Sequence, residues 1–216
     1  MLLTELPYLP PIAFFSSILA DGKDEVNPLL LDAHEHYRKQ TYRNRALILT
    51  AQGVKPLTVP VLDGNRSEKV RTADILLDYR ENWPHQHFRT LQTAYGNSPY
   101  FSYYADYLHD LYAQKPARLW DLNLAFLQVL LRCLRLPAPL HFTTQYYAPG
   151  AQTPHSPIHP FTHSLIDRRD ACSPKKPHPD TPAARPYPQL FGLPFVPGLS
   201  ILDLLFMQGP QSGSYL

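Results

Sequence analysis

Residues 45–61 have the sequence RALILTAQGVKPLTVPV, and this stretch decides the fold class. Apolar and β-branched residues flank Gly53 on both sides, which is typical of a β-hairpin with the glycine in its turn. Pro60 lacks the N–H that a central strand donates, so the second strand is expected at a sheet edge or near its own end. Upstream, the leucines at 29–31 predict another short, buried strand.

Helices are predicted on both sides of this hairpin. After Trp83 the apolar residues recur with a helical period, and over 119–136 they share one face of a helix. Pro11 suits a first helical turn, and Ser200 with Gly209 is typical of the two caps of a short helix. We therefore expect helices over residues 11–19, 84–95, 100–112, 119–136 and 200–209.

The pattern as a whole predicts an α/β protein, in which a small mixed sheet with an early hairpin is covered by several helices. Residues 138–186 show no lasting period and contain many prolines, which exclude a regular helix, so a long Pro-rich loop or flap is expected there. A chain of 216 residues that is 44% hydrophobic fits a single domain over 1–216.

Charge and cysteine content narrow the class of protein. The formal net charge is only +2, so any basic patch is local, and a nucleic-acid partner is not expected. Cys133 and Cys172 lie far apart in the sequence, which favours a reducing cytoplasm over a disulfide framework. No apolar run approaches the roughly 18 residues that span a bilayer. We expect a cytoplasmic protein with no membrane span.

The most polar stretch, residues 34–45, precedes the first strand of the hairpin and holds four cations, one acid, two histidines and two amides. In an extended strand, residues two apart share a face, so Arg43 and Arg45 are expected to point the same way. An arginine fork suits phosphate or carboxylate, which would make this face an anion site. The alternative is a structural ion-pair network in which Asp32 and Glu35 neutralise the arginines.

Two side chains on the predicted helices are further candidates. His87 flanks the apolar stripe of its helix, which fits either a buried structural histidine or a general acid or base. Arg89 lies almost opposite that stripe, so the two cannot converge on one ligand. Asn123 falls within the apolar face of the 119–136 helix, where a buried amide must bond either to backbone groups of a neighbouring loop or to a ligand.

The Pro-rich loop contains Lys175, which is either solvated or part of a lid that closes over a bound anion. His155, His159 and His163 recur every fourth residue, but the prolines between them prevent the helix that would align metal ligands. We therefore predict no metal site. The sequence contains no phosphate-binding glycine loop, and the cofactor, where one is used, stays unknown.

Several of these segments resemble the WbqC-like family of bacterial proteins, and the resemblance covers nearly the whole chain. The matching segments are 8–11, 39–45, 57–61, parts of 83–95, 98–101, 121–123, 167–168, 174–175, 187–189, 199–205 and 209–210. Two departures are Asp32, where the family often has glutamate, and a loop at 149–160 that is richer in histidine and proline. The resemblance implies a role in O-antigen or other surface-polysaccharide biosynthesis, a link that rests on gene context.

The leading hypothesis is an enzyme that transfers a group on a sugar nucleotide or another phosphate-bearing substrate. The residues expected to form its site are Arg43 and Arg45 for the anion, Lys175 from the loop, His87 as acid or base, and Tyr42, Asn44 and Asn123 to orient the substrate. The alternative is a non-catalytic binding or scaffold protein, whose polar groups would be dispersed or paired among themselves.

Overall fold

Strand β1 (Leu2–Thr4) lies inside a parallel sheet of the computed structural model, which describes residues 1–19, 26–62, 70–148, 165–174, 185–191 and 194–216. The strand order is β5-β2-β1-β6, and all three neighbouring pairs are parallel. Strand β2 (Leu29–Leu31) is the predicted leucine strand, in register with β1 from Leu2↔Leu29 to Thr4↔Leu31. Both inner strands are buried throughout, which suits parallel strands that are covered on both faces.

The hairpin that the sequence predicted is confirmed. Strands β3 (Arg45–Thr50) and β4 (Gly53–Thr58) pair antiparallel from Arg45↔Thr58 to Thr50↔Gly53. Gly53 has a φ of +99°, a conformation that residues with a side chain rarely adopt, so the glycine allows the tight turn. Strand β4 is mostly exposed, as expected for an edge strand.

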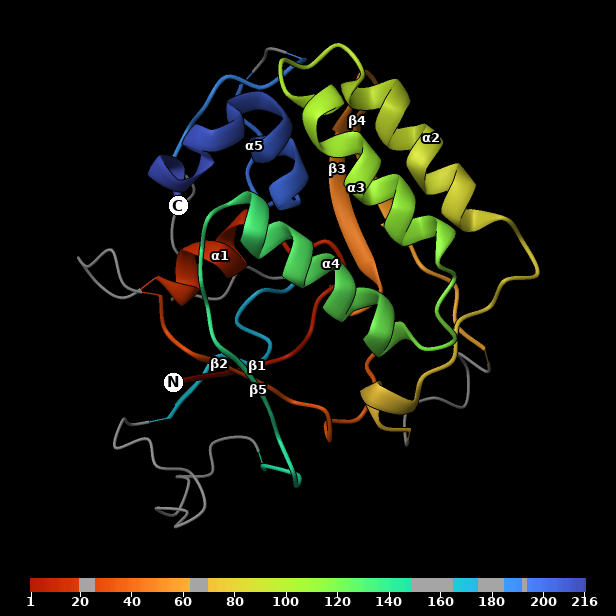
Figure 1. Cartoon of the computed structure of the whole chain (residues 1–216), viewed down its shortest axis with the longest axis vertical. Coiled ribbons are helices and arrows are strands. Elements are labelled where there is room, and N and C mark those ends of the chain that lie inside the picture. The colour runs from red at the N-terminus through yellow and green to blue at the C-terminus, as the bar shows by residue number, and fades with distance from the viewer. Residues whose placement is uncertain (20–25, 63–69, 149–164, 175–184, 192–193) are drawn as a thin grey trace.

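The predicted helices are present, with ends that differ by a few residues. They are α1 (Ile12–Ile18), α2 (Trp83–Tyr95), α3 (Phe101–Ala113), α4 (Leu119–Cys133) and α5 (Ile201–Gln208), together with two short 3-10 helices, η2 (Thr72–Asp74) and η3 (Gly209–Tyr215). In Figure 1, α2 and α3 run side by side with the hairpin behind them, while β1, β2 and β5 meet at the opposite end of the molecule. Helix α4 lies between these two regions.

The Pro-rich segment differs in part from its prediction as a loop. It contains β5 (Leu140–Phe142) and β6 (Ile166–Asp167), which form the two outer strands of the parallel sheet. Strands this short leave no period in the sequence, and their pairing partners lie at the far N-terminal end of the chain. Residues 149–164 and 175–184 of the segment lie outside the described residues.

The C-terminal helix is tied to the core through a buried carboxylate. As predicted, Ser200 caps α5, with its Oγ accepting the N–H of Leu202 at 3.3 Å. Asp203 is fully buried and accepts hydrogen bonds from the hydroxyls of Tyr95 at 2.8 Å and Tyr187 at 2.5 Å.

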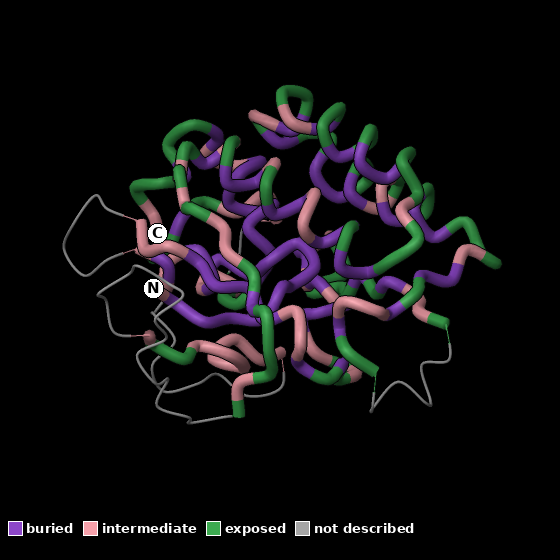
Figure 2. Tube along the Cα trace, turned by 60° about the horizontal axis from the view of Figure 1, so that its bottom comes forward, coloured by how far each residue is buried: buried purple, intermediate pink, exposed green. Residues whose placement is uncertain are grey.

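Figure 2 shows the buried chain running through the middle of the molecule and the exposed positions on its rim. Within the described ranges, no helix has the length and apolar character to cross a lipid bilayer.

Candidate functional site

Arg43, the centre of the predicted anion site, is buried and held by carboxylates of the chain itself. Its Nε and Nη2 donate to the two carboxylate oxygens of Glu35 at 2.7 and 2.5 Å, and its Nη1 donates to Asp170 at 3.1 Å. Only 1% of its side chain is exposed. This bidentate pairing is the structural ion-pair network that the sequence left open as an alternative, and ligand binding by Arg43 stays a prediction.

The strand geometry expected for this run is corrected. Strand β3 begins at Arg45, which is half-buried, whereas residues 41–44 form a turn in which the carbonyl of Tyr42 accepts the N–H of Tyr8 at 2.8 Å. Arg43 and Arg45 therefore do not share one face of an extended strand. The reason is a local side-chain hydrogen bond that favours the turn, in which the N–H of Arg43 donates to the Thr41 hydroxyl at 3.4 Å.

Arg43 belongs to a larger group of charges at the carboxyl ends of the parallel strands. Glu5 follows β1, Asp32 follows β2, and Asp170 lies three residues beyond β6. Arg169 donates to Asp32 at 2.8 Å, and the N–H of Asp170 donates to Glu5 at 2.9 Å. Burial raises the pKa of Glu5 to about 7, although the Arg43 charge opposes that shift. Open parallel sheets often bind ligands at this edge, but here the described charges pair with one another.

The neutral candidates beside Arg43 bond to the backbone. Asn123 donates through Nδ2 to the carbonyls of Leu6 at 3.0 Å and Arg43 at 2.8 Å. Asn44 donates to the carbonyl of Val59 at 3.0 Å, and the hydroxyl of Tyr42 donates to that of Gly198 at 3.4 Å. These three side chains are buried, and their described contacts connect loops to the core.

His87 lies in an aromatic cluster of the core. Its Nδ1 is 2.9 Å from the Tyr8 hydroxyl, which in turn is 2.5 Å from the hydroxyl of Tyr112. Burial lowers the pKa of His87 to about 4, so the ring is neutral at physiological pH. The surroundings are those of a satisfied structural histidine, and a catalytic role for His87 stays a prediction.

The remaining candidates of the sequence analysis lie in the segments that the structure does not describe. Lys175 lies outside the described residues, and so do His155, His159 and His163. Within the described ranges, no three histidine, cysteine, aspartate or glutamate side chains are grouped so that they could hold a metal ion.

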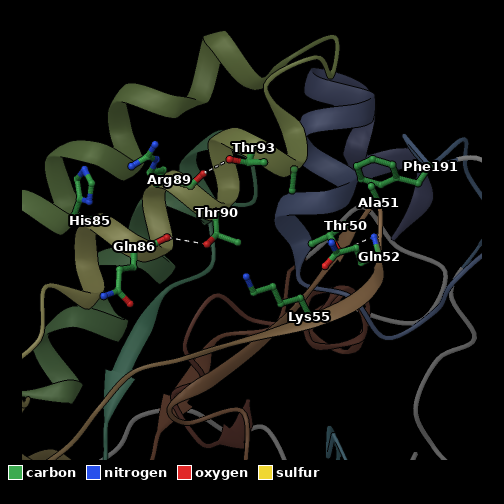
Figure 3. Close-up of a pocket in the computed structure, with 11 residues that line it drawn as sticks. Thr50, Ala51, Gln52, Lys55, His85, Gln86, Arg89, Thr90, Thr93 and Phe191 are labelled. Carbon is green, nitrogen blue, oxygen red and sulfur yellow. Dashed lines mark hydrogen bonds between the residues drawn. The ribbon is translucent and has the colours of Figure 1, made fainter.

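An open cavity of about 520 Å³ lies between the hairpin and α2 (Figure 3). We call it the hairpin–α2 cavity. The residues that line it are Thr50, Ala51, Gln52, Lys55, His85, Gln86, Arg89, Thr90, Thr93, Ala94 and Phe191. Its charged or titratable lining residues are Lys55, His85 and Arg89, and the described lining contains no carboxylate. The cavity is therefore suited to an anion.

Both walls of this cavity are held by local hydrogen bonds. On α2, the hydroxyls of Thr90 and Thr93 donate to the carbonyls four residues earlier, at 2.8 and 2.9 Å, which leaves their oxygen lone pairs able to accept from a ligand. On the hairpin, the hydroxyl of Thr50 donates to the Gly53 carbonyl at 2.8 Å and closes the turn. In Figure 3, Lys55 extends from the hairpin on the side facing Gln86 and Thr90.

Sequence reasoning missed most of this cavity. It placed Arg89 opposite the apolar stripe and away from His87, and the structure likewise exposes Arg89 and buries His87. His85 and Arg89 are four residues apart on α2, a spacing that could have indicated a shared face. No pattern in the sequence, however, indicates that the hairpin with Lys55 faces that side of the helix.

Comparison with known proteins identifies the family. A model of the WbqC-like protein family matches residues 7–168 and 179–215. A Mycobacterium tuberculosis (strain ATCC 25618 / H37Rv) protein described as "Uncharacterized protein Rv1507c" is 29% identical over 225 residues, which cover 97% of this chain and 94% of the relative. No solved structure gives a significant match. Because the family model spans nearly all of the sequence, the chain belongs to the WbqC-like protein family.

Proposed function

We propose that the protein binds a phosphate-bearing small molecule, such as a sugar nucleotide, in the hairpin–α2 cavity and takes part in group transfer on it during surface-polysaccharide biosynthesis. The observation that carries the binding proposal is the lining of the cavity, in which Lys55, His85 and Arg89 lie without a described carboxylate. The resemblance to WbqC-like proteins, whose link to O-antigen synthesis comes from gene context, supports the biosynthetic setting.

The chemistry of the lining favours a phosphate over a neutral ligand. Arginine offers a planar fork that donates two parallel hydrogen bonds to one phosphate, and lysine adds a point charge. The cavity volume of about 520 Å³ lies within the range of ordinary small-molecule sites. Threonine hydroxyls and the amides of Gln52 and Gln86 can bond to sugar hydroxyls beside the phosphate.

This proposal moves the anion site away from the run at 34–45. Arg43 already has two carboxylate partners, and removing it from them would leave buried charges unpaired. Arg89 and Lys55, by contrast, lie at an open surface where a ligand can reach them.

A second candidate function is binding without catalysis. It is favoured by the surroundings of His87, which is buried in the core with its Nδ1 bonded to the Tyr8 hydroxyl. Among the described lining residues, His85 is then the side chain available to move a proton. Catalysis and binding alone therefore differ in what they require of His85.

Titration calorimetry with UDP-glucose, dTDP-glucose and GDP-mannose tests the binding proposal. Arg89→Gln should weaken binding about tenfold or more, because a hydrogen bond to a charged group contributes about 1.5–3 kcal/mol. Arg118→Gln is the matched control, since it removes one exposed cation that lines no described cavity. Absence of binding to every nucleotide, or equal affinities of the two variants, would refute the proposal.

Mass spectrometry of the bound nucleotide after incubation with a bacterial metabolite extract separates the two candidate functions. A change of mass that His85→Gln abolishes supports group transfer. A nucleotide that is bound tightly and recovered unchanged supports binding without catalysis.

A further inference from the structure

A second cavity, of about 460 Å³, lies on the other side of the exposed face of α2, where that helix packs against α3. We call it the α2–α3 cavity. Like the first, it is lined by cationic side chains, Arg89 and Lys115, and its described lining contains no carboxylate. The carboxylate of Asp110, which is not among the lining residues, lies 3.6 Å from Nδ1 of His109.

The two cavities share part of their lining. His85 and Arg89 line both of them, and these residues are one helical turn apart on α2. They therefore form a ridge between the cavities, and Figure 3 shows both side chains projecting from this helix. An anion held on the ridge would have one cavity on each side.

The two cavities differ in the side chains they offer. The hairpin–α2 cavity presents threonine hydroxyls and glutamine amides, which suit the hydroxyls of a sugar. The α2–α3 cavity presents the rings of Phe88 and His109, and the buried Tyr112 also contributes to its lining. Phe88 and His109 pack edge to face with centroids 5.1 Å apart, and Phe88 is only partly buried, so a planar base can stack on the ring surface that stays exposed.

From this arrangement we propose that the ligand is a nucleoside diphosphate joined to a sugar, lying across α2. The diphosphate is held by Arg89 and His85, the sugar occupies the hairpin–α2 cavity beside Lys55, and the base stacks on Phe88 with Lys115 nearby. This proposal rests on the proposed function. It extends the binding site to the α2–α3 cavity and assigns the base, the diphosphate and the sugar to separate places along it. Each cavity alone has the size of a small-molecule site, so neither is too small for its part.

The test compares a whole ligand with its halves by calorimetry: UDP-glucose, UDP and glucose 1-phosphate, or the matching set for whichever nucleotide sugar binds tightest. Phe88→Leu should weaken the binding of UDP and of UDP-glucose about tenfold, since stacking of one base contributes about 1–3 kcal/mol. Lys115→Gln should weaken the binding of the same two ligands. Both variants should leave the affinity for glucose 1-phosphate unchanged. Lys55→Gln should weaken the binding of glucose 1-phosphate and UDP-glucose more than the binding of UDP. Arg89→Gln should weaken the binding of all three ligands.

Controls keep the outcomes distinct. Arg118→Gln should leave every affinity unchanged, and thermal melting checks that Phe88→Leu folds, with the exposed Lys115→Gln as the second variant. One outcome would overturn the proposed placement of base and sugar in separate cavities while leaving the anion site intact. In that outcome UDP-glucose and glucose 1-phosphate bind with equal affinity. Arg89→Gln abolishes the binding of both, and Phe88→Leu and Lys115→Gln do not affect it. Binding that does not depend on Arg89 would overturn the proposed function itself.

Discussion

Replacing Glu5 with glutamine should change how stability depends on pH. The Glu5 carboxyl is 3% exposed at the end of β1, and it accepts the N–H of Asp170 at 2.9 Å. Burial raises its pKa from the ordinary 4.5 to about 7, with the nearby Arg43 acting in the opposite direction. The folded state therefore binds the Glu5 proton more tightly than the unfolded state does.

The sign and size of the effect follow from this difference. Below pH 4.5 the carboxyl is protonated in both states, and the favourable contribution is fully present. As the pH rises from 4.5 to about 7, the unfolded chain has released the proton that the folded chain retains, so stability falls. At about 1.4 kcal/mol per pH unit, the loss reaches about 3 kcal/mol. Glutamine does not titrate, so the stability of Glu5→Gln relative to the native chain should rise by that amount.

His87 opposes this trend in the native chain. Burial lowers its pKa from 6.5 to about 4, so stability is complete above 6.5 and is lost as the pH falls towards 4. The two groups therefore nearly cancel between about pH 4.5 and 6.5. The informative quantity is the difference in free energy of unfolding between Glu5→Gln and the native chain.

Urea unfolding at a series of pH values between about 4 and 8 measures this difference. The exposed Glu81→Gln serves as the matched control, because it removes one surface carboxylate in the same way. A difference for Glu5→Gln that is flat with pH, or one that rises as the pH falls, would refute the reasoning.

Three further substitutions test the core. Arg43→Met leaves the buried Glu35 carboxylate without its arginine, while Asp170 keeps Arg38, and should cost about 3–5 kcal/mol in urea unfolding; a loss below about 1 kcal/mol would contradict the ion-pair network. Gly209→Ala should lower the melting temperature because its φ is +53° and the new methyl overlaps the ring of Tyr100, whereas Gly213→Ala meets nothing within 4 Å and should not. Asp203→Ala removes the acceptor to which two buried tyrosine hydroxyls donate and should cost about 2–4 kcal/mol; an unchanged midpoint of denaturation would be the contrary result.

The elements that the sequence predicted well have strong local signals. Helix α4 has an apolar face over four turns, and the hairpin has a glycine between two apolar runs. The strands that were missed, β1, β5 and β6, are two or three residues long and are stabilised by partners distant in the sequence. Local propensity cannot indicate strands whose pairing depends on residues more than a hundred positions away.

The candidate site shows the same limit. Arg43 was singled out for its charge, yet Asp170, one of its partners, lies 127 residues further along the chain. Lys55 and His85 were not among the predicted residues, since a polar side chain on an exposed strand or helix is ordinary in sequence. They line one cavity only because the hairpin lies against α2, which is a property of the tertiary structure alone.

The parallel sheet also constrains how the chain can be made. Its inner strands, β1 and β2, are complete once residue 31 is synthesised, but both outer strands come from residues 140–167. A nascent chain on the ribosome therefore carries two leucine-rich strands with open edges until its C-terminal third emerges. Such edges pair readily with other chains. Expression of fragments that end before β5 should consequently favour chaperone binding or aggregation, even though the helical region is already present.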